Sequence, residues 1–271
     1  MLFRYPGGKN KIKKPILDRL YELAKYEDDI KYGEFFFGSG SIGIEFIRDR
    51  SKKTKVLLND KDYGIACLWT AVIQEPMFLI DKIKGFIPSV YKFEQFKHDL
   101  IRDYRKDYLK TAFKKLVVHQ TSYSGLGTKS GPLGGQNQKS EYNIGCRWNT
   151  PLLIKKIGEL HKVLNSVNII GNKCWNEDFG YFFNNKSVSG LIYLDPPYFC
   201  QGNNLYQEGM SVDDHVRLAN LLRETHHKWV LSYDDCPTIR ELYSWADITE
   251  IPVTYTINGA AATIELLIEK I

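Results

Sequence analysis

Apolar and polar residues alternate along this chain with two different periods. Short apolar runs that begin at Val56 and Leu191 stop at polar or turn residues, which predicts buried strands. Between such runs, apolar positions recur at helical spacing, as in the amphipathic stretch from Lys14 to Leu23. A further strand is predicted from Glu34 to Phe37, followed by a helix that begins near Ile44. This alternation of predicted strands and helices predicts an α/β fold.

The last third of the chain predicts a strand at Trp229–Tyr233, a helix near Thr238–Trp245 and a terminal pair of strands. This pair, Ile251–Ile257 and Thr263–Glu269, flanks Asn258-Gly259, a dipeptide typical of a tight turn. We therefore expect an antiparallel β-hairpin at the end of a mostly parallel sheet.

The spacing of the first and fourth strands predicts an insertion. In a plain alternating domain a strand and a helix together take roughly 30 residues, so strand four should follow strand one by roughly 90. Here Gly40 and Asp195, which follow those strands, are 155 positions apart. We place an inserted domain at residues 75–165, so that residues 1–74 and 166–271 form one catalytic domain.

A rigid, polar turn follows the apolar run that ends at Leu194. It consists of Asp195-Pro196-Pro197-Tyr198, at the strand end where open α/β sheets bind ligands. Two prolines stiffen the turn and leave its carbonyls as acceptors. The carboxylate and carbonyls suit an exocyclic amine and the tyrosine suits a flat heterocycle, as in sites that act on an extruded base. The alternative is a turn that merely ends a strand.

The predicted strand from Glu34 runs into a glycine-rich turn, Phe37-Gly38-Ser39-Gly40, with the spacing Gly-x-Gly-x-x-Gly. About twenty residues on, a second strand ends at Asp60, an acid suited to ribose hydroxyls. A nucleoside is expected across these two strand ends. The two motifs leave NAD and S-adenosylmethionine both open, and Asp60 could instead cap a helix.

A third motif lies near the N-terminus, in Tyr5-Pro6-Gly7-Gly8-Lys9. Its proline and glycines predict a turn that places Lys9 near a helix start. A lysine is unfavourable for the helix dipole there, which indicates a ligand carboxylate or phosphate nearby. The alternative is a solvated loop lysine.

Taken in this order, the motifs resemble the Dam-like, α-ordered (D12 class) adenine-specific DNA N6-methyltransferases. The resemblance extends from Phe3 to the C-terminal strands. It implies a Rossmann-like S-adenosylmethionine-dependent methyltransferase fold, with a mixed, mostly parallel seven-stranded sheet, a C-terminal β-hairpin and a smaller, mainly helical insert domain. The terminal hairpin is typical of that architecture and atypical of NAD-binding folds.

The resemblance also implies a cofactor, S-adenosyl-L-methionine, and its pocket. The segment Asn176–Phe179 matches the part of the family that holds the cofactor adenine, and Leu205-Tyr206 and Asp213–His215 match further family positions. The expected cofactor residues are Tyr5, Lys9, Phe37, Gly38, Ser39, Gly40, Asp60, Asp178, Phe179 and Asp195.

The expected catalytic residues are Asp195, Pro196, Pro197 and Tyr198. The N6 lone pair of adenine is delocalised into the ring, so it needs activation. Asp195 and the Pro196 carbonyl would accept its two N–H bonds, and Tyr198 would stack on the flipped base. Direct in-line attack on the sulfonium methyl then needs positioning and electrostatics, with no metal.

The insert has features that suit double-stranded DNA. Lysines and arginines between Lys92 and Lys115 alternate with aromatic residues, which fits phosphate contact on one helix face and core on the other. The alternative is a solvated helix with Asp99, Asp103 and Asp107 as ion-pair partners. The long polar loop at about 122–150 is interpreted as a flexible, base-reading hairpin, and alternatively as a disordered linker.

The expected DNA-binding residues are Tyr123, Ser124, Lys129, Asn143 and Arg147. Tyr123 matches the position of a family residue that inserts into the duplex as the target base leaves it. Members that read GATC carry Asn and a base-reading Arg where this chain has Ser124 and Thr128, which puts GATC specificity in doubt. Lys129 or Arg147 would replace the missing donor.

Composition narrows the remaining possibilities. The 271 residues carry a net charge of +5, which permits nucleic-acid binding. Five cysteines without Cys-x-x-Cys spacing argue for a reducing compartment and against zinc or a disulfide framework, and six histidines show no metal-ligand spacing. No Pro-Cys pair is present for cytosine C5-methylation. No apolar run approaches the ~18–20 residues of a membrane helix, and no leader is visible.

We therefore expect a cytoplasmic protein of bacterial, archaeal or phage origin, monomeric, with a cognate restriction endonuclease as a possible cellular partner. Four alternatives stay open. They are an RNA adenine N6-methyltransferase, a protein glutamine methyltransferase (which usually has Asn at position 195), a cytosine N4 enzyme (often Ser there) and a catalytically idle DNA-binding module.

Overall fold

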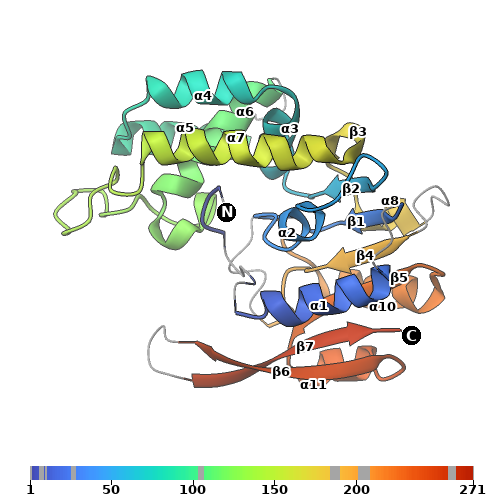
Figure 1. Cartoon of the computed structure of the whole chain (residues 1–271). Helices are drawn as coiled ribbons and strands as arrows, with labels where there is room; N and C mark the ends of the chain where they lie inside the picture. The colour runs from blue at the N-terminus through green and yellow to red at the C-terminus, as the bar shows by residue number, and fades with distance from the viewer. Residues whose placement is uncertain are drawn as a thin grey trace.

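A seven-stranded sheet runs through the protein in its computed structural model (Figure 1). The structure describes residues 2–5, 9, 11–25, 29–102, 107–183, 190–200, 208–255 and 261–270. The strands are β1 (Lys31–Glu34), β2 (Lys55–Asn59), β3 (Asn168–Trp175), β4 (Leu191–Leu194), β5 (Lys228–Asp234), β6 (Asp247–Tyr255) and β7 (Ala261–Glu269).

The strand order is β3-β2-β1-β4-β5-β7-β6, and β7 alone runs antiparallel to its two neighbours. The order reverses between β1 and β4, so their carboxyl ends open a crevice of the kind that binds ligands. The register pairs Glu34 with Tyr193, which brings the chain after β1 beside the Asp195 turn. The predicted sheet with its terminal β-hairpin is thus confirmed, while the Asn258-Gly259 turn lies outside the described residues.

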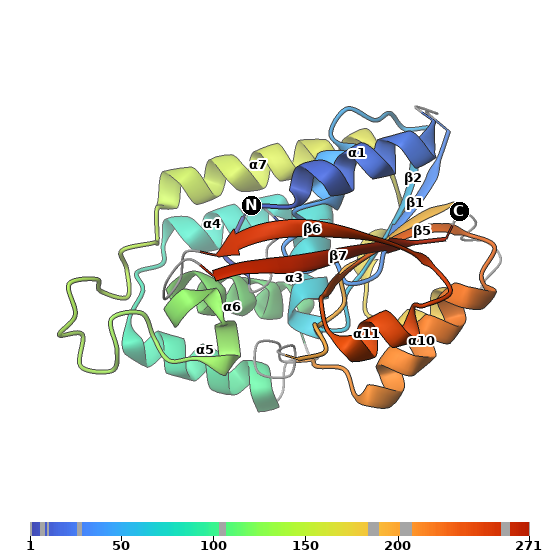
Figure 2. The same ribbon diagram turned by 90° about the horizontal axis from the view of Figure 1, so that it is seen from below.

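Helices cover both faces of the sheet (Figure 2). The first face carries α1 (Lys13–Ala24), α2 (Gly43–Ile47) and α3 (Tyr63–Gln74), and the second carries α8 (Phe179–Phe183), α10 (Val212–Glu224) and α11 (Pro237–Leu242). Successive residues of a strand alternate between the two cores: Leu58 and Tyr193 face the first, and Leu57 and Ile192 the second.

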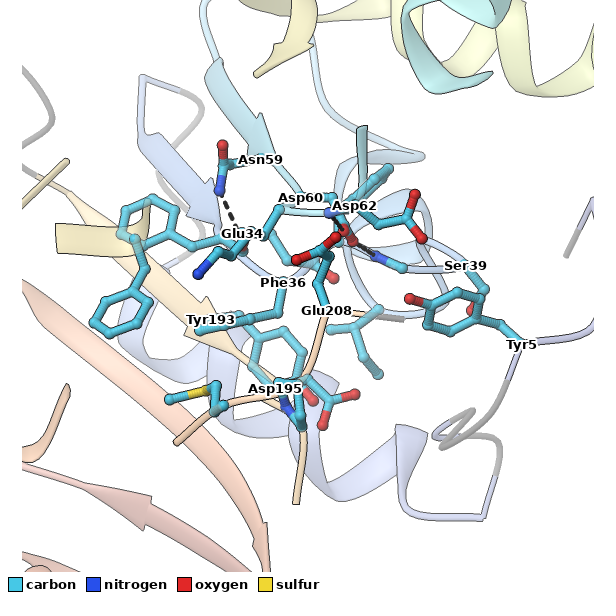
Figure 3. Close-up of a pocket in the computed structure, with 18 of the residues that line it drawn as sticks. Tyr5, Glu34, Phe36, Ser39, Asn59, Asp60, Asp62, Tyr193, Asp195 and Glu208 are labelled. Atoms are coloured by element: carbon cyan, nitrogen blue, oxygen red, sulfur yellow. Dashed lines mark hydrogen bonds between the residues drawn. The ribbon is translucent and has the colours of Figure 1, made fainter. Parts of the chain in front are cut away.

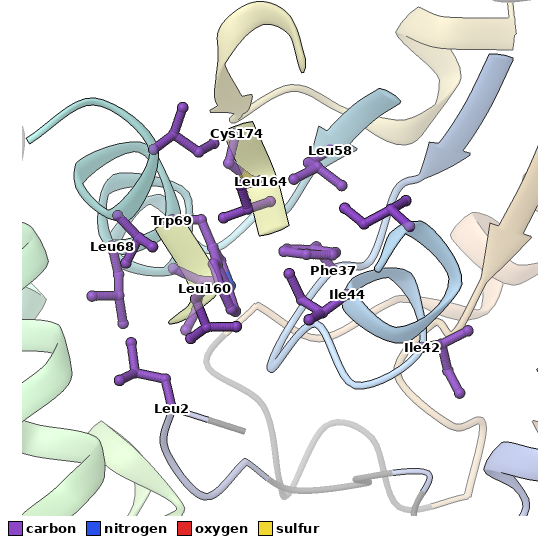
Figure 4. Packing of buried hydrophobic residues seen from close by; sticks show 14 of the residues in the cluster. Leu2, Phe37, Ile42, Ile44, Leu58, Leu68, Trp69, Leu160, Leu164 and Cys174 are labelled. Carbon is purple, nitrogen blue, oxygen red and sulfur yellow. The ribbon is translucent and has the colours of Figure 1, made fainter. Parts of the chain in front are cut away.

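The predicted insert contains four helices above the sheet in Figure 1. They are α4 (Pro76–Lys84), α5 (Val90–Arg102), α6 (Tyr108–Thr121) and α7 (Thr150–Ser166). Side chains of α4, α6 and α7 belong to the same buried cluster as the sheet residues. Leu160 and Leu164 of α7, for example, lie by Trp69 of α3 (Figure 4). The insert helices therefore complete the core of the first face.

One local prediction needs correction. The strand expected at Glu34–Phe37 is wrong in its position, because β1 ends at Glu34 and the aromatic residues follow it. The Phe37 amide still donates to the Asn59 carbonyl over 3.0 Å, which holds this segment against β2. In the 122–150 loop, which is expected to form a base-reading hairpin on DNA, the structure has two 3-10 turns, η1 (Tyr123–Gly125) and η2 (Gly127–Lys129), and one bridge between Ser122 and Pro132.

Within the described part of the chain, no single helix is long and apolar enough to cross a membrane. The pair α3 and α4 reaches the required length and composition only together, across a bend of 104°.

Candidate active site

A cleft of about 840 Å³, counting the solvent at its mouth, opens where β1, β2 and β4 end (Figure 3). Tyr5, the glycine turn, Asp60 and Asp195 converge on it from four separate segments of the chain. Of the expected cofactor residues, those that line the cleft are Tyr5, Phe37, Gly38, Ser39, Asp60, Phe179 and Asp195.

The glycine turn has a backbone that other residues adopt only with strain. Gly38 and Gly40 have φ of +48° and +67°. A Cβ on Gly38 would lie 2.8 Å from the Tyr5 ring, and one on Gly40 would lie 2.8 Å from Phe37. The Trp69 indole donates to the Gly38 carbonyl over 2.8 Å and fixes the turn from α3. Gly38 thus faces the cleft, whereas Gly40 lines a separate groove toward α7.

Asp60 follows β2 and braces the glycine turn. One carboxylate oxygen accepts from the Gly38 amide over 2.7 Å, and the other accepts from the Asp62 amide over 2.9 Å. The N-cap of α3 is Asp62, whose side chain accepts from the Ile65 amide over 3.2 Å, so the helix-cap alternative does not apply to Asp60. Burial and the neighbouring Asp62 carboxylate raise the pKa of Asp60 to about 7.

The Asp195 carboxylate lies at the other wall of the cleft. The Lys9 ammonium is 2.6 Å from it, and the Ser232 hydroxyl donates to the same oxygen over 3.1 Å. Burial raises the pKa of Asp195, and the charge of Lys9 opposes this shift. Lys9 also lies 4.4 Å from the centre of the Tyr198 ring. A cation thus bridges the acceptor and the aromatic ring of the motif.

The turn after Asp195 is fixed at both ends. Pro196 and Pro197 are buried, and Pro197 lines the cleft. Beyond Tyr198, the Asp234 carboxylate at the end of β5 accepts from the amides of Phe199 and Cys200 over 3.2 and 3.1 Å. The turn therefore has little freedom to reorient.

The segment before α8 places Glu177, and not the expected Asp178, at the cleft. The rings of Phe179 and Phe36, 5.7 Å apart, both line the cleft. The Asp178 carboxylate is not among the lining groups, because it binds the Arg217 guanidinium through two hydrogen bonds of 2.7 Å. Its neighbour Glu177 lines the cleft instead. Leu205 and Tyr206 lie outside the described residues.

Acidic groups dominate the cleft, which sequence reasoning did not foresee. Among the described residues that line it, seven are acidic and one, Lys61, is basic. Such a wall repels a pyrophosphate and suits a ligand with hydroxyls and positive charge, as S-adenosylmethionine has. Two of these acids, Asp60 and Asp195, were expected at the cofactor, because each follows a predicted strand. The acidic lining residues are Glu34, Asp60, Asp62, Glu177, Asp195, Glu208 and Asp214.

The expected DNA-binding residues lie in and after the two 3-10 turns. Tyr123 is 63% exposed, and Ser124 and Lys129 are exposed beside it. The exposed Asn143 accepts from the Gly145 amide over 2.9 Å. Arg147 is half-buried, and burial together with the charge of Arg4 lowers its pKa.

The base of this loop packs against the N-terminal segment. A Cβ on Gly125 would lie 2.6 Å from the Arg4 Cβ, and the neighbouring Tyr5 lines the cleft. Tyr123 begins the turn that contains Gly125. The loop and the cleft are therefore joined through residues 2–5.

Several lysines in the basic run of the insert form ion pairs with aspartates, which leaves them less available for phosphate contacts. Lys114 pairs with Asp99 at 2.7 Å, and Lys110 with Asp107 at 3.1 Å. Lys115, expected among the phosphate contacts, is 2% exposed and bound to Asp62, so that expectation is wrong. It lies on the buried side of α6 with Ala112 and Leu116. Residues 103–106 lie outside the described part of the chain.

The sheet order and the position of the cleft define a Rossmann-like methyltransferase fold. The chain belongs to the D12 class N6 adenine-specific DNA methyltransferase family, whose sequence profile matches residues 5–257. Membership implies methyl transfer to adenine in DNA and the use of S-adenosylmethionine. A comparison with curated proteins finds no match.

Proposed function

We propose that the protein methylates N6 of a flipped-out adenine at a specific site in double-stranded DNA, with the Asp195–Tyr198 turn as its catalytic element. The observation that carries this proposal is the position of that turn. Asp195, a hydrogen-bond acceptor, lies at the wall of an acidic cleft at the ends of β1, β2 and β4, and the Tyr198 ring follows on a rigid turn. An exocyclic amine held there would stand between the acceptor and the cofactor pocket.

The cleft residues fit the cofactor. Asp60 offers a carboxylate to ribose hydroxyls, and Phe36 and Phe179 offer apolar faces to an adenine ring. Gly38 leaves open the space that a Cβ would take. When bound, S-adenosylmethionine supplies an electrophilic methyl group on a sulfonium sulfur.

The protein's own part in the reaction is to bind and orient the adenine amine. Asp195 and the Pro196 carbonyl accept its two N–H bonds, which frees the nitrogen lone pair. The Lys9 ammonium, 2.6 Å from Asp195, favours the ionised form of this acceptor, and the incoming amine takes over one of its contacts. Tyr198 stacks on the base, a contact worth about 1–3 kcal/mol at comparable sites. No covalent enzyme intermediate is needed, because the amine is itself the nucleophile.

Residues 75–165 are proposed as the target-recognition region, with the 122–150 loop as its base-reading part. Tyr123 supports this role, because a large exposed ring is positioned by a turn that packs on the N-terminal segment. Lys129, Asn143 and Arg147 are the polar groups offered to base edges or phosphates. One adenine is modified per turnover, and a monomer suffices for that.

The test is tritiated-methyl transfer from S-adenosylmethionine to unmethylated genomic DNA, followed by nucleoside analysis and long-read mapping of modified positions. N6-methyladenine at one short motif supports the proposal and supplies the recognition site. Incorporation into RNA alone would overturn the substrate and leave the chemistry. No transfer to either would overturn the catalytic proposal in favour of a binding module.

A further inference from the structure

Lys115 is a buried lysine that joins a helix of the insert to the catalytic domain. It lies on α6, and its ammonium is 2.5 Å from the Asp62 carboxylate at the start of α3. Its aliphatic stem passes over Gly64, where a Cβ would lie 2.7 Å from the lysine Cδ. The glycine in the first turn of α3 thus leaves the space through which the lysine reaches Asp62.

The contact continues from Asp62 to the cofactor side of the cleft. The Asp62 amide donates to one oxygen of Asp60, and the other Asp60 oxygen accepts from the Gly38 amide. Asp62, Asp60 and Gly38 all line the cleft, whereas Lys115 reaches them from behind. One chain of short contacts therefore runs from α6 to the glycine turn.

The charge of Lys115 has a definite task in this arrangement. Asp60 and Asp62 are neighbouring buried carboxylates, and each disfavours ionisation of the other. Burial raises the pKa of Asp62, but Lys115 outweighs it and the pKa lies below its usual value. The same charge opposes the upward pKa shift that burial and Asp62 impose on Asp60.

Other titratable groups face this pair from the surrounding elements. Glu34 at the end of β1 and Cys174 on β3 lie near Asp60, and His119 on α6 lies near Asp62. Burial holds Glu34 and Cys174 toward their neutral forms by raising their pKa, and it lowers the pKa of His119, with Lys115 adding to that shift. A change at Lys115 therefore acts on Asp62 by direct contact, and it also acts on the protonation of Asp60, whose pKa is about 7.

We propose that Lys115 is a positioning residue for cofactor binding, which holds Asp62 in an ion pair and opposes protonation of Asp60, the carboxylate that faces the cofactor ribose. The inference rests on the proposed function, since it assumes S-adenosylmethionine in this cleft. It assigns to an insert helix a part in cofactor affinity. Without the lysine, a larger share of Asp60 binds a proton at neutral pH, which removes an acceptor site and weakens the hold of Asp60 on the Gly38 turn.

The test is calorimetric titration of the purified protein with S-adenosylmethionine and S-adenosylhomocysteine from about pH 6 to about pH 9. Lys115→Met should weaken binding about fivefold near pH 7, the effect of a rise of one unit in the pKa of Asp60 from about 7. The loss should shrink to within about threefold near pH 9, where Asp60 is ionised again. The matched control is Lys114→Met, the same change one position earlier, where the lysine pairs with Asp99 away from the cleft.

Two further variants separate charge from packing. Asp62→Asn with Lys115→Met removes both charges and keeps an N-cap residue, so the midpoint of the pH profile should return toward that of the unmodified protein. Lys115→Gln keeps a donor for Asp62 without the charge and should reproduce the upward pH shift. It serves as the test if Lys115→Met does not fold.

Two results would overturn the inference alone: a folded Lys115→Met protein with unchanged affinity and pH profile, or an affinity loss equal at every pH. Unmodified protein that binds neither compound would overturn the proposed function and this inference together.

Discussion

The Tyr198 hydroxyl donates a hydrogen bond of 2.5 Å to the carboxylate of Glu265. Glu265 lies on β7, is 4% exposed and pairs with Asp234 across the sheet. The aromatic ring after the Asp-Pro-Pro turn is therefore fixed by the C-terminal hairpin, 67 positions further along the chain. Burial and the charges of Asp195 and Glu265 raise the pKa of Tyr198, so its hydroxyl stays protonated and able to donate.

Removing either side of this contact should have the same consequence. Glu265→Gln and Tyr198→Phe each weaken or delete the hydrogen bond that orients the ring, and we expect kcat/KM to fall about tenfold in each, as for a bond to a charged group. Steady-state methyl transfer to a DNA duplex measures it. The double variant should lose no more than the worse single variant, and additive losses would refute a shared role.

Asp195→Asn should remove most of the turnover with little effect on DNA affinity. The amide lacks the negative charge that frees the adenine lone pair, and loss of one such electrostatic contact lowers kcat by about 10²–10³-fold. Single-turnover kinetics together with a DNA-binding titration separate the two effects. Asp18→Asn, which changes an exposed acid on α1, is the control and should retain full rate. Equal rates in both variants would rule out Asp195 as the amine acceptor.

Gly40→Ala tests a glycine whose role is structural. At a φ of +67° the new Cβ would lie 2.8 Å from Phe37 and 3.0 Å from Trp69. Overpacking of this kind costs about 1–3 kcal/mol of unfolding free energy. Urea denaturation measures the loss. Gly85→Ala, where no atom lies within 4 Å of the new Cβ, is the comparison and should change stability far less.

Tyr123→Ala should impair base flipping without destabilising the fold. The side chain is 63% exposed, and exposed substitutions change stability by within about 0.5 kcal/mol. Fluorescence of 2-aminopurine at the target position reports flipping, and we expect its increase on binding to be largely lost. Tyr91→Ala, an equally exposed tyrosine on α5, should behave as the unmodified protein. A normal fluorescence increase with Tyr123→Ala would exclude the wedge.

The buried His119 should make the protein sensitive to mild acid. Burial, aided by Lys115, lowers its pKa to about 3, against 6.5 for the free side chain. Between these values the unfolded chain binds a proton that the folded protein does not, so stability rises with pH and falls as pH drops below about 6.5. The slope from this residue is about 1.4 kcal/mol per pH unit. Urea denaturation between about pH 5 and pH 7 should show a shallower slope for His119→Gln.

The sequence was sufficient for the parts of the site that local chemistry defines. A turn must follow Leu194 because two prolines do, and the glycine turn needs residues without a Cβ at Gly38 and Gly40. The two strands of the terminal hairpin were predicted in the same way, from their apolar residues and the turn residues between them. These features depend on neighbours in the chain, which a sequence displays directly.

Contacts between distant segments could not be predicted in the same way. Asp178 was expected at the cofactor, but the facing helix α10 presents Arg217 to it. Lys115 was grouped with the phosphate-binding lysines, because it belongs to the same basic run of the sequence. Only the packing of α6 on α3 shows that its side chain is buried. No motif in the sequence surrounds Glu265, and its partner Tyr198 follows a different strand, 67 positions earlier in the chain.

Because α4, α6 and α7 share one core with the sheet, residues 75–165 are not an interchangeable module. Replacing them as a block would remove apolar side chains that pack against Trp69, which fixes the glycine turn at Gly38. Exchange of the 122–150 loop alone leaves those side chains in place. Under the proposed function, new base preferences must therefore arise in a surface stretch of 29 residues while its support stays constant. Changes in sequence specificity are therefore confined to this short segment, and an engineered exchange of specificity should replace this segment alone.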